Sequence, residues 1–320
     1  PWHGLGTAVP GAMTMAQAIQ LGNLDWEVEK QALITVPGLS VPEFFATVRK
    51  DASRALGVVG RGYEVVQNRD ALRFFDSALG ENAAAIDTVG ALGHGEVIWA
   101  MAKIPEIVEI TEGDPIEHYL LLMTSHDGST AIKALFTPVR VVCNNTLSAA
   151  LRGAKQTVSV KHTKNVDDHL DAAHKILAEG NRYWERVRGA FKWMAKTEMT
   201  TETVQAFMDS MFPPKVRRKE VTTTDPLTGE PVTTEQDIVE VAARTLAVRK
   251  EILDLFEGEG LGADLAGKTK WGMFNAVTEW VDYNRKSRTG INNWQNSVLG
   301  LGANVRQKAF DFLLTETEQK

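Results

Sequence analysis

The residues best suited to bind a ligand lie in a stretch of the chain that contains no acid. Between Gly128 and Val166 there is no aspartate or glutamate, although the whole chain has a formal net charge of −6. Lysine and arginine neutralise phosphate groups, while asparagine, serine and threonine donate hydrogen bonds to phosphate oxygens. A carboxylate in the same place would repel such a ligand. The candidate nucleic-acid-binding residues of this acid-free window are Lys133, Arg140, Asn144, Asn145, Arg152, Lys155, Lys161, His162 and Lys164.

Burial is the competing explanation for this window. A strand and a helix in a core also lack acids, because an unpaired charge is costly to bury. The apolar run at 131–142 fits that explanation, but the polar segment at 152–165 does not. A helix beginning at Asn144 or Asn145 would add backbone N–H donors for an anion. The pattern therefore favours a track for an anionic polymer, without distinguishing DNA from RNA.

A second set of residues could serve a metal or a nucleophile. His126, Asp127 and His162 could bind a divalent metal, and Cys143 is a candidate nucleophile. However, the HDG at 126–128 has the composition of a hairpin turn, and a single cysteine after an apolar strand is typical of a core. The sequence also lacks a phosphate-binding loop and an evident pair of carboxylates. We therefore expect no catalysis, no cofactor and no metal, with a metal-dependent enzyme acting on nucleic acid as an alternative.

The composition sets the class of protein. The 320 residues are 43% hydrophobic and 24% charged, which is typical of a globular protein. The single cysteine excludes an internal disulfide framework, and we expect a reducing cytoplasm. The sequence has no apolar run near the roughly 18 residues of a membrane span, so we expect no membrane partner. The acidic pI of 5.7 does not exclude one basic stripe, because a polyanion responds to local charge.

Hydrophobic periodicity predicts an α+β fold in two regions. Residues 1–165 are expected to form an α+β core with the binding groove, built as an antiparallel meander with helices. The short glycine-containing connections at 93–95 and 126–128 are typical of hairpins. A short helix is predicted at 69–79. Strands are predicted at 26–30, 55–60, 63–68, 84–92, 96–104, 117–125 and 129–137.

Residues 166–320 are expected to be mainly helical. Proline and glycine stop the predicted helices, and residues 215–234 are polar enough to predict an exposed loop or, alternatively, a weak hairpin. The basic KVRRK at 215–219 is typical of a solvated patch or, alternatively, of a second phosphate contact. Trp271 and Trp280 share an apolar face and are expected in the core, whereas Trp294 is the candidate for base stacking. Helices are predicted over 170–194, 201–212, 238–256 and 271–281.

Five longer motifs carry a family resemblance. They are PWHGLGT at 1–7, LGVVGRGYEVVQN at 56–68, SHDGSTAIKALFTPVRVVCNNTL at 125–147, VKHT at 160–163 and TKWGMFNAVTEWVDYNR at 269–285. Together they resemble the phage/plasmid-like proteins of the domain-of-unknown-function 932 family. The resemblance covers most of the chain and is weakest over 215–234. It implies a phage, prophage or plasmid origin, and the family name conveys no activity.

A strand meander followed by a helix is also similar to the core of single-strand annealing proteins of the RecT and Red-beta type. That similarity implies a groove for single-stranded DNA, floored by the sheet and running across the subunits of a ring or filament. We therefore expect an ATP-independent, homo-oligomeric DNA-binding and annealing protein for phage or plasmid recombination in the host cytoplasm. A metal-dependent enzyme on nucleic acid and a structural or regulatory phage protein, such as a host-defence antagonist, remain open as alternatives.

Overall fold

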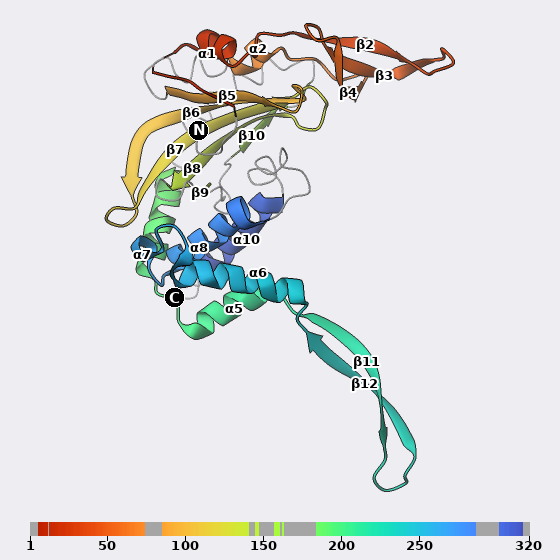
Figure 1. Cartoon of the computed structure of the whole chain (residues 1–320), viewed down its shortest axis with the longest axis vertical. Coiled ribbons are helices and arrows are strands. Elements are labelled where there is room, and N and C mark those ends of the chain that lie inside the picture. The colour runs from red at the N-terminus through yellow and green to blue at the C-terminus, as the bar shows by residue number, and fades with distance from the viewer. Residues whose placement is uncertain are drawn as a thin grey trace.

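The protein is an α+β structure, which confirms the predicted fold class (Figure 1). Antiparallel sheets with short helices form the N-terminal half, and the C-terminal half is mainly helical. No helix among the described residues is long and apolar enough to cross a membrane. The computed structural model describes residues 6–11, 13–73, 85–140, 145–146, 157–160, 162, 184–285 and 301–315.

A curved antiparallel sheet forms the centre of the N-terminal half (Figure 1). Four strands in sequence order make the predicted meander: β5 (Ala85–Leu92), β6 (Val97–Glu109), β7 (Pro115–Ser125) and β8 (Ile132–Arg140). The edges are β1 (Thr7–Ala8) beside β5 and β10 (Thr157–Val160) beside β8, while β9 (Asn145–Thr146) also pairs with β8. Asn145 is therefore in a strand opposite Arg140, and not at the beginning of a helix as predicted.

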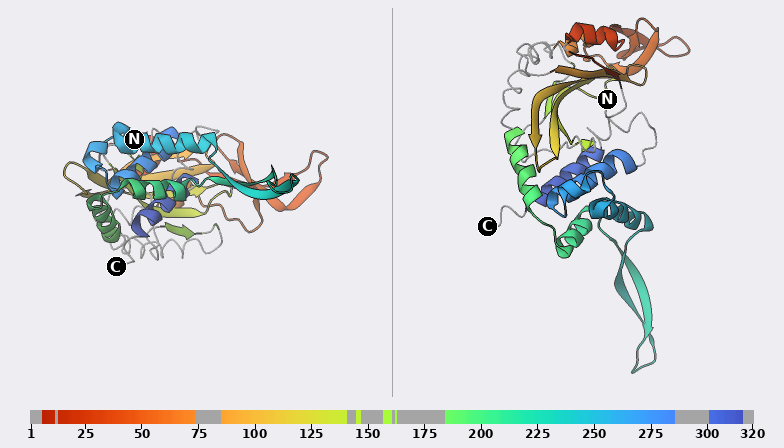
Figure 2. Two further views of the ribbon diagram at one scale, coloured as in Figure 1. Left: turned by 90° about the horizontal axis from the view of Figure 1, so that it is seen from below. Right: turned by 60° about the vertical axis from the view of Figure 1, so that its left-hand side comes forward.

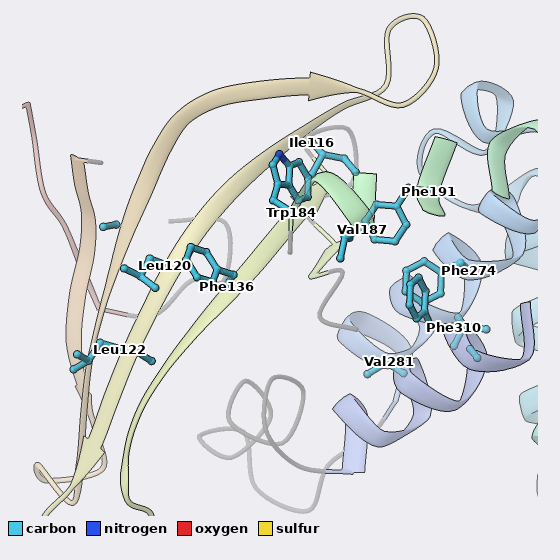
Figure 3. Packing of buried hydrophobic residues seen from close by; sticks show 14 of the residues in the cluster. Ile116, Leu120, Leu122, Phe136, Trp184, Val187, Phe191, Phe274, Val281 and Phe310 are labelled. Atoms are coloured by element: carbon cyan, nitrogen blue, oxygen red, sulfur yellow. The ribbon is translucent and has the colours of Figure 1, made fainter. Parts of the chain in front are cut away.

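The strands of this sheet are apolar on both faces, which explains the nearly continuous apolar run of β7. Leu120, Leu122 and Phe136 belong to one buried cluster, whereas their neighbours Leu121 and Leu135 belong to another. Side chains alternate between the two faces of a strand, so both faces are covered. Figure 3 shows the first cluster continuing from the sheet into the helices. Its labelled members there are Trp184, Val187, Phe191, Phe274, Val281 and Phe310.

The helices of the C-terminal half pack around this cluster. Residues 184–196 are helical and connect the sheet to the other helices (Figure 2). Phe191 contacts Trp271 and Phe274, with ring centroids 4.8 and 5.8 Å apart. The remaining elements are α5 (Thr201–Met211), α6 (Ala243–Asp254), η1 (Leu255–Glu259), α7 (Ala263–Ala266), α8 (Lys270–Glu279), η2 (Trp280–Asn284) and α10 (Leu301–Leu314).

Two of the helix predictions are confirmed and one is wrong at its beginning. The predicted helices at 201–212 and 271–281 correspond to α5 and to α8 with η2. Thr200 and Thr269 cap the first turns, each accepting a backbone N–H with its hydroxyl. The helix predicted over 238–256 begins only at Ala243, because the residues before it belong to a strand. Trp271 and Trp280 are buried as predicted, and Trp294 lies outside the described residues.

Two strand elements project from this body (Figures 1 and 2). The first is a three-stranded sheet of β2 (Val28–Ile34), β3 (Ser40–Arg49) and β4 (Arg54–Gly60), flanked by α1 (Met15–Leu21) and α2 (Asn68–Leu72). The second is a hairpin of β11 (Lys215–Thr224) and β12 (Pro231–Glu240), where the sequence predicted an exposed loop with a weak hairpin as the alternative. The strand predicted at 63–68 is wrong, because residues 63–67 have no regular structure.

Candidate nucleic-acid interface

The structure pairs the two ends of the acid-free window at one edge of the large sheet. β8 and β10 are antiparallel neighbours, and Lys133 lies directly opposite Ser159. Lys133 is half-buried and Ser159 is exposed. Among the described strands β10 is the last of this sheet, so its outer edge is unpaired. One cation and one hydroxyl residue of the window therefore meet at a sheet edge.

The other candidate residues are only partly placed. Arg140 ends β8, where its backbone lies opposite Ile116 on one side and Asn145 on the other. β10 directly precedes Lys161 and His162 in the chain. Five candidates lie outside the described residues: Asn144, Arg152, Lys155, Lys161 and Lys164. The described geometry therefore places Lys133, Arg140 and Asn145 on neighbouring strands of one sheet.

His162 differs from the other candidates because it is buried. Its Nε2 lies 3.0 Å from the Thr124 hydroxyl, and its Nδ1 lies 3.2 Å from the carbonyl oxygen of Glu64. Its ring stacks on Tyr63 with centroids 4.7 Å apart. Burial lowers the pKa of His162, so the neutral ring is favoured. In this arrangement neither ring nitrogen is available to a nucleic acid.

His126 is also enclosed by protein. Its Nε2 lies 2.7 Å from the amide oxygen of Asn68, and its ring meets Trp26 edge-on. The amide nitrogen of Asn68 donates to the carbonyl oxygen of Leu24, so its oxygen is the acceptor and His126 Nε2 is the donor. Burial, assisted by the nearby His162, lowers the pKa of His126 to about 4. His126 is thus a neutral hydrogen-bond donor of the core.

These contacts bring three sequence motifs together at one junction. LGVVGRGYEVVQN contributes Tyr63, whose hydroxyl donates to the carbonyl oxygen of Ser125 in the SHDG segment at 2.6 Å. The backbone N–H of Glu64 donates to the carbonyl oxygen of His162 in VKHT. We name this set, with Asn68 and His126, the motif junction. Sequence reasoning assigned its histidines to a ligand or a metal, because contacts between residues this far apart in the chain leave no local pattern.

The sequence matches the model of one protein family. A family model described as Domain of unknown function (DUF932) matches residues 55–299. The chain belongs to the DUF932 family. The DUF932 region contains the motif junction, the β8–β10 edge and the β11–β12 hairpin, whereas β2 and β3 precede it. Searches of curated proteins and of solved structures found no match.

The DUF932 region offers little support for metal chemistry at the motif junction. Within the part of the chain that the structure describes, no group of three or more His, Cys, Asp and Glu residues could hold a metal ion. Asp127 accepts a hydrogen bond from the backbone N–H of Ser129, as an aspartate in a turn does. The Nε2 atom of His126 and both ring nitrogens of His162 are hydrogen-bonded to protein, whereas Nδ1 of His126 is buried without a hydrogen-bond partner among the described residues. The hydrogen bonds of the junction connect the segment after the three-stranded sheet to the end of β7.

A cavity of about 310 Å³ adjoins the motif junction, because Asn68 lines it, and it lies between α1, α2 and the segment at 24–27. Asp25, Glu27, Arg69 and Arg73 line it together with apolar residues. Arg69 pairs with Glu27 at 3.3 Å. Because acids and bases alternate around this cavity, it lacks the single sign of charge that a phosphate track needs.

Proposed function

We propose that this DUF932 protein binds single-stranded DNA along the β8–β10 edge of its large sheet. It then anneals strands without ATP during phage or plasmid recombination in the host cytoplasm. It acts as a non-catalytic homo-oligomer. The observation that carries this proposal is the pairing of β8 with β10, because it joins the two ends of the acid-free window at one edge.

The charge environment of Lys133 supports the proposal. Some cations elsewhere are paired, for example Lys103 with Glu117 and Arg249 with Asp209, whereas others such as Lys192 and Lys196 appear in no ion pair of the described residues. Lys133 takes part in none of the ion pairs found within the described ranges. The first acid that follows it in the sequence is Asp167. A half-exposed ammonium group next to the edge strand, without an ion pair among the described residues, is well suited to a phosphate. The outer edge of β10, which pairs with no described strand, offers further backbone N–H donors on the side away from β8.

A titration of a fluorescently labelled oligonucleotide tests the proposal. Phosphate contacts release counterions, so the affinity for single-stranded DNA should fall about ten- to hundredfold between 50 and 200 mM salt. Fluorescence anisotropy at the two salt concentrations measures this change. Unchanged anisotropy at 50 mM salt with tens of micromolar protein would reject DNA binding and favour a structural or regulatory phage protein.

Charge-removing variants then locate the site. Lys133→Gln combined with Lys155→Gln should weaken binding about three- to thirtyfold and reduce the salt dependence, because two phosphate contacts are lost. The matched control is Lys192→Gln with Lys196→Gln, which removes two exposed charges from the helical residues 184–196. Equal losses in the window variant and the control would show that the binding depends only on net charge. Annealing is measured with complementary oligonucleotides in the absence of ATP.

A further inference from the structure

The β11–β12 hairpin is a ribbon of two strands with no partner on either edge among the described strands. Its strands pair from Lys215 opposite Glu240 to Thr224 opposite Pro231. Figures 1 and 2 show it pointing away from the helices in each view. The outer part, from 220 to 234, is exposed or half-exposed throughout, and Leu227 at the tip is 94% exposed. Both edges therefore present free backbone N–H and C=O groups.

A ribbon of this kind is expected to be completed by another strand. An isolated two-stranded hairpin is at best marginally stable in water, and no described strand adds a third strand to this one. Its outer half is rich in threonine and valine, residues that favour strands. The hydroxyls of Thr222 and Thr233 contact across the ribbon at 3.1 Å, and the side chains of residues 220–234 are exposed or half-exposed. Strand addition at an edge supplies the missing backbone hydrogen bonds.

The charge pattern of the hairpin indicates which partner fits. Residues 215–219 of β11 contain four cations and no acid, whereas residues 235–240 of β12 contain three acids and no cation. The register sets these two stretches side by side at the base of the hairpin, with Arg218 opposite Asp237. The hairpin as a whole carries four cations and six acids, so a nucleic acid is a poor partner for it. A second copy of the hairpin offers a basic strand for β12 of the first copy and an acidic strand for its β11.

We propose that the hairpin joins copies of this chain by strand addition, with β12 of one copy pairing antiparallel to β11 of the next. In this pairing the tips of the two hairpins point the same way, and neighbouring strands continue to alternate in direction. The acidic base of one β12 then lies beside the basic base of the neighbouring β11. A symmetric β12–β12 pair would instead set the base of one hairpin against the tip of the other. The charges therefore favour head-to-tail association, which produces a ring or a filament.

This inference does not depend on DNA binding. It names the surface through which the proposed DNA-binding protein self-associates, and the assembly is measured without nucleic acid. If the protein assembles but does not bind DNA, the inference stands and the proposed function is rejected. If it is a monomer that binds DNA, the inference is rejected and the proposed DNA binding stands.

Sedimentation velocity with charge-reversed chains tests the inference. The wild-type protein at tens of micromolar and low salt should sediment well above its chain mass of 35.2 kDa. A basic-strand variant, Arg218→Glu with Lys219→Glu, should sediment as the monomer. An acidic-strand variant, Glu235→Lys with Asp237→Lys, should do the same. An equimolar mixture of the two variants should assemble again, because each supplies the charge that the other has lost.

Two further chains separate contacts between copies from contacts within one hairpin. Reversing all four residues in one chain restores opposite charges within the hairpin and between copies, so it should assemble. If this chain assembles but the mixture does not, the charges act within one hairpin and the inference is overturned. Lys192→Glu with Lys196→Glu is the matched control and should leave assembly unchanged.

A shortened hairpin covers the case in which a charge-reversed chain fails to fold, as judged by circular dichroism. An Asn-Gly turn in place of residues 222–233 leaves the helices untouched and removes most of both edges. This chain should sediment as the monomer. A monomeric wild-type protein, or a shortened chain that still assembles, would overturn the inference.

Discussion

His118, His126 and His162 are buried, and burial disfavours the charged form of each ring. It lowers the pKa of His118 to about 3 and that of His126 to about 4, and it also lowers the pKa of His162. In the unfolded chain a histidine has a pKa near 6.5. At a pH between the native pKa and the unfolded pKa of a histidine, the unfolded chain binds a proton there that the native protein does not. The free energy of unfolding must therefore decrease as the pH falls below about 6.5.

We expect acid to destabilise the protein through His126 in particular. For this residue the difference between the two pKa values corresponds to about 3 kcal/mol, lost progressively between about pH 6.5 and pH 4. Urea unfolding at pH 7.5, 6.0, 5.0 and 4.5 measures the loss. His126→Gln should reduce this pH dependence, whereas His94→Gln, at an exposed histidine, should leave it unchanged. A His126→Gln protein with the pH dependence of the wild type would contradict the burial of a neutral ring.

At the scale of elements, the three-stranded sheet meets the end of β7 at a very close backbone contact. A β-carbon on Gly57 of β4 would lie 2.5 Å from the Cα atom of Asp127. Gly60, three residues along the same strand, has no atom within 4 Å of its β-carbon position. The two glycines therefore differ in their surroundings although they share a strand.

We expect Gly57→Ala to destabilise the protein by about 1–3 kcal/mol, because the methyl group forces β4 away from the SHDG segment. This corresponds to a decrease of several degrees in the thermal midpoint, measurable by differential scanning calorimetry. Gly60→Ala is the control and should change the midpoint by no more than about one degree. Equal midpoints for the two variants would show that β4 can move away from Asp127 without cost.

The meander of β5 to β8 could be predicted because each strand is apolar and each turn contains glycine. The β11–β12 hairpin was predicted only as the alternative to an exposed loop, since its threonines and two prolines resemble those of a loop. β3 was missed for a related reason: Pro42 and the Phe44–Phe45 pair interrupt the alternation of polar and apolar residues. Tertiary pairing determines both elements.

Part of the candidate site could likewise be predicted from the sequence, and part could not. The acid-free window is a property of composition, so it is visible in the sequence alone. The burial of His162 depends on Thr124 and Glu64, which are 38 and 98 residues away. No local pattern predicts such contacts, and a histidine within a basic segment resembles a ligand-binding residue. The binding role of Lys133 and its neighbours stays a prediction.

At the scale of the whole molecule, a buried hydrogen bond connects the sheet to the helices. The indole N–H of Trp271 in α8 donates to the carboxylate of Asp114, between β6 and β7, at 2.8 Å. Asp114 and Trp271 are both fully buried. Nearby, the hydroxyl of Thr111 donates to the carbonyl oxygen of Leu265. These contacts and the shared apolar cluster make the two halves depend on each other for stability.

We expect Trp271→Phe to lower the free energy of unfolding by about 2–3 kcal/mol, because it removes a donor from a buried carboxylate. Trp280→Phe is the matched control. It removes the indole N–H that donates to Glu251, whose carboxylate is exposed and can bond to water instead. The control should cost less than about 1 kcal/mol in urea unfolding. Similar losses for both variants would show that indole packing, and not the bond to Asp114, determines the stability.

The bond between Asp114 and Trp271 also has a consequence for synthesis on the ribosome. The two residues are 157 positions apart. At about 5–20 residues per second, roughly ten to thirty seconds pass between their translation. During that interval the strands of the sheet have emerged, but α8, whose Trp271 supplies the donor for the buried carboxylate of Asp114, has not. The sheet is therefore synthesised before the helix that stabilises it. We expect the nascent chain to need protection from aggregation until α8 has been translated.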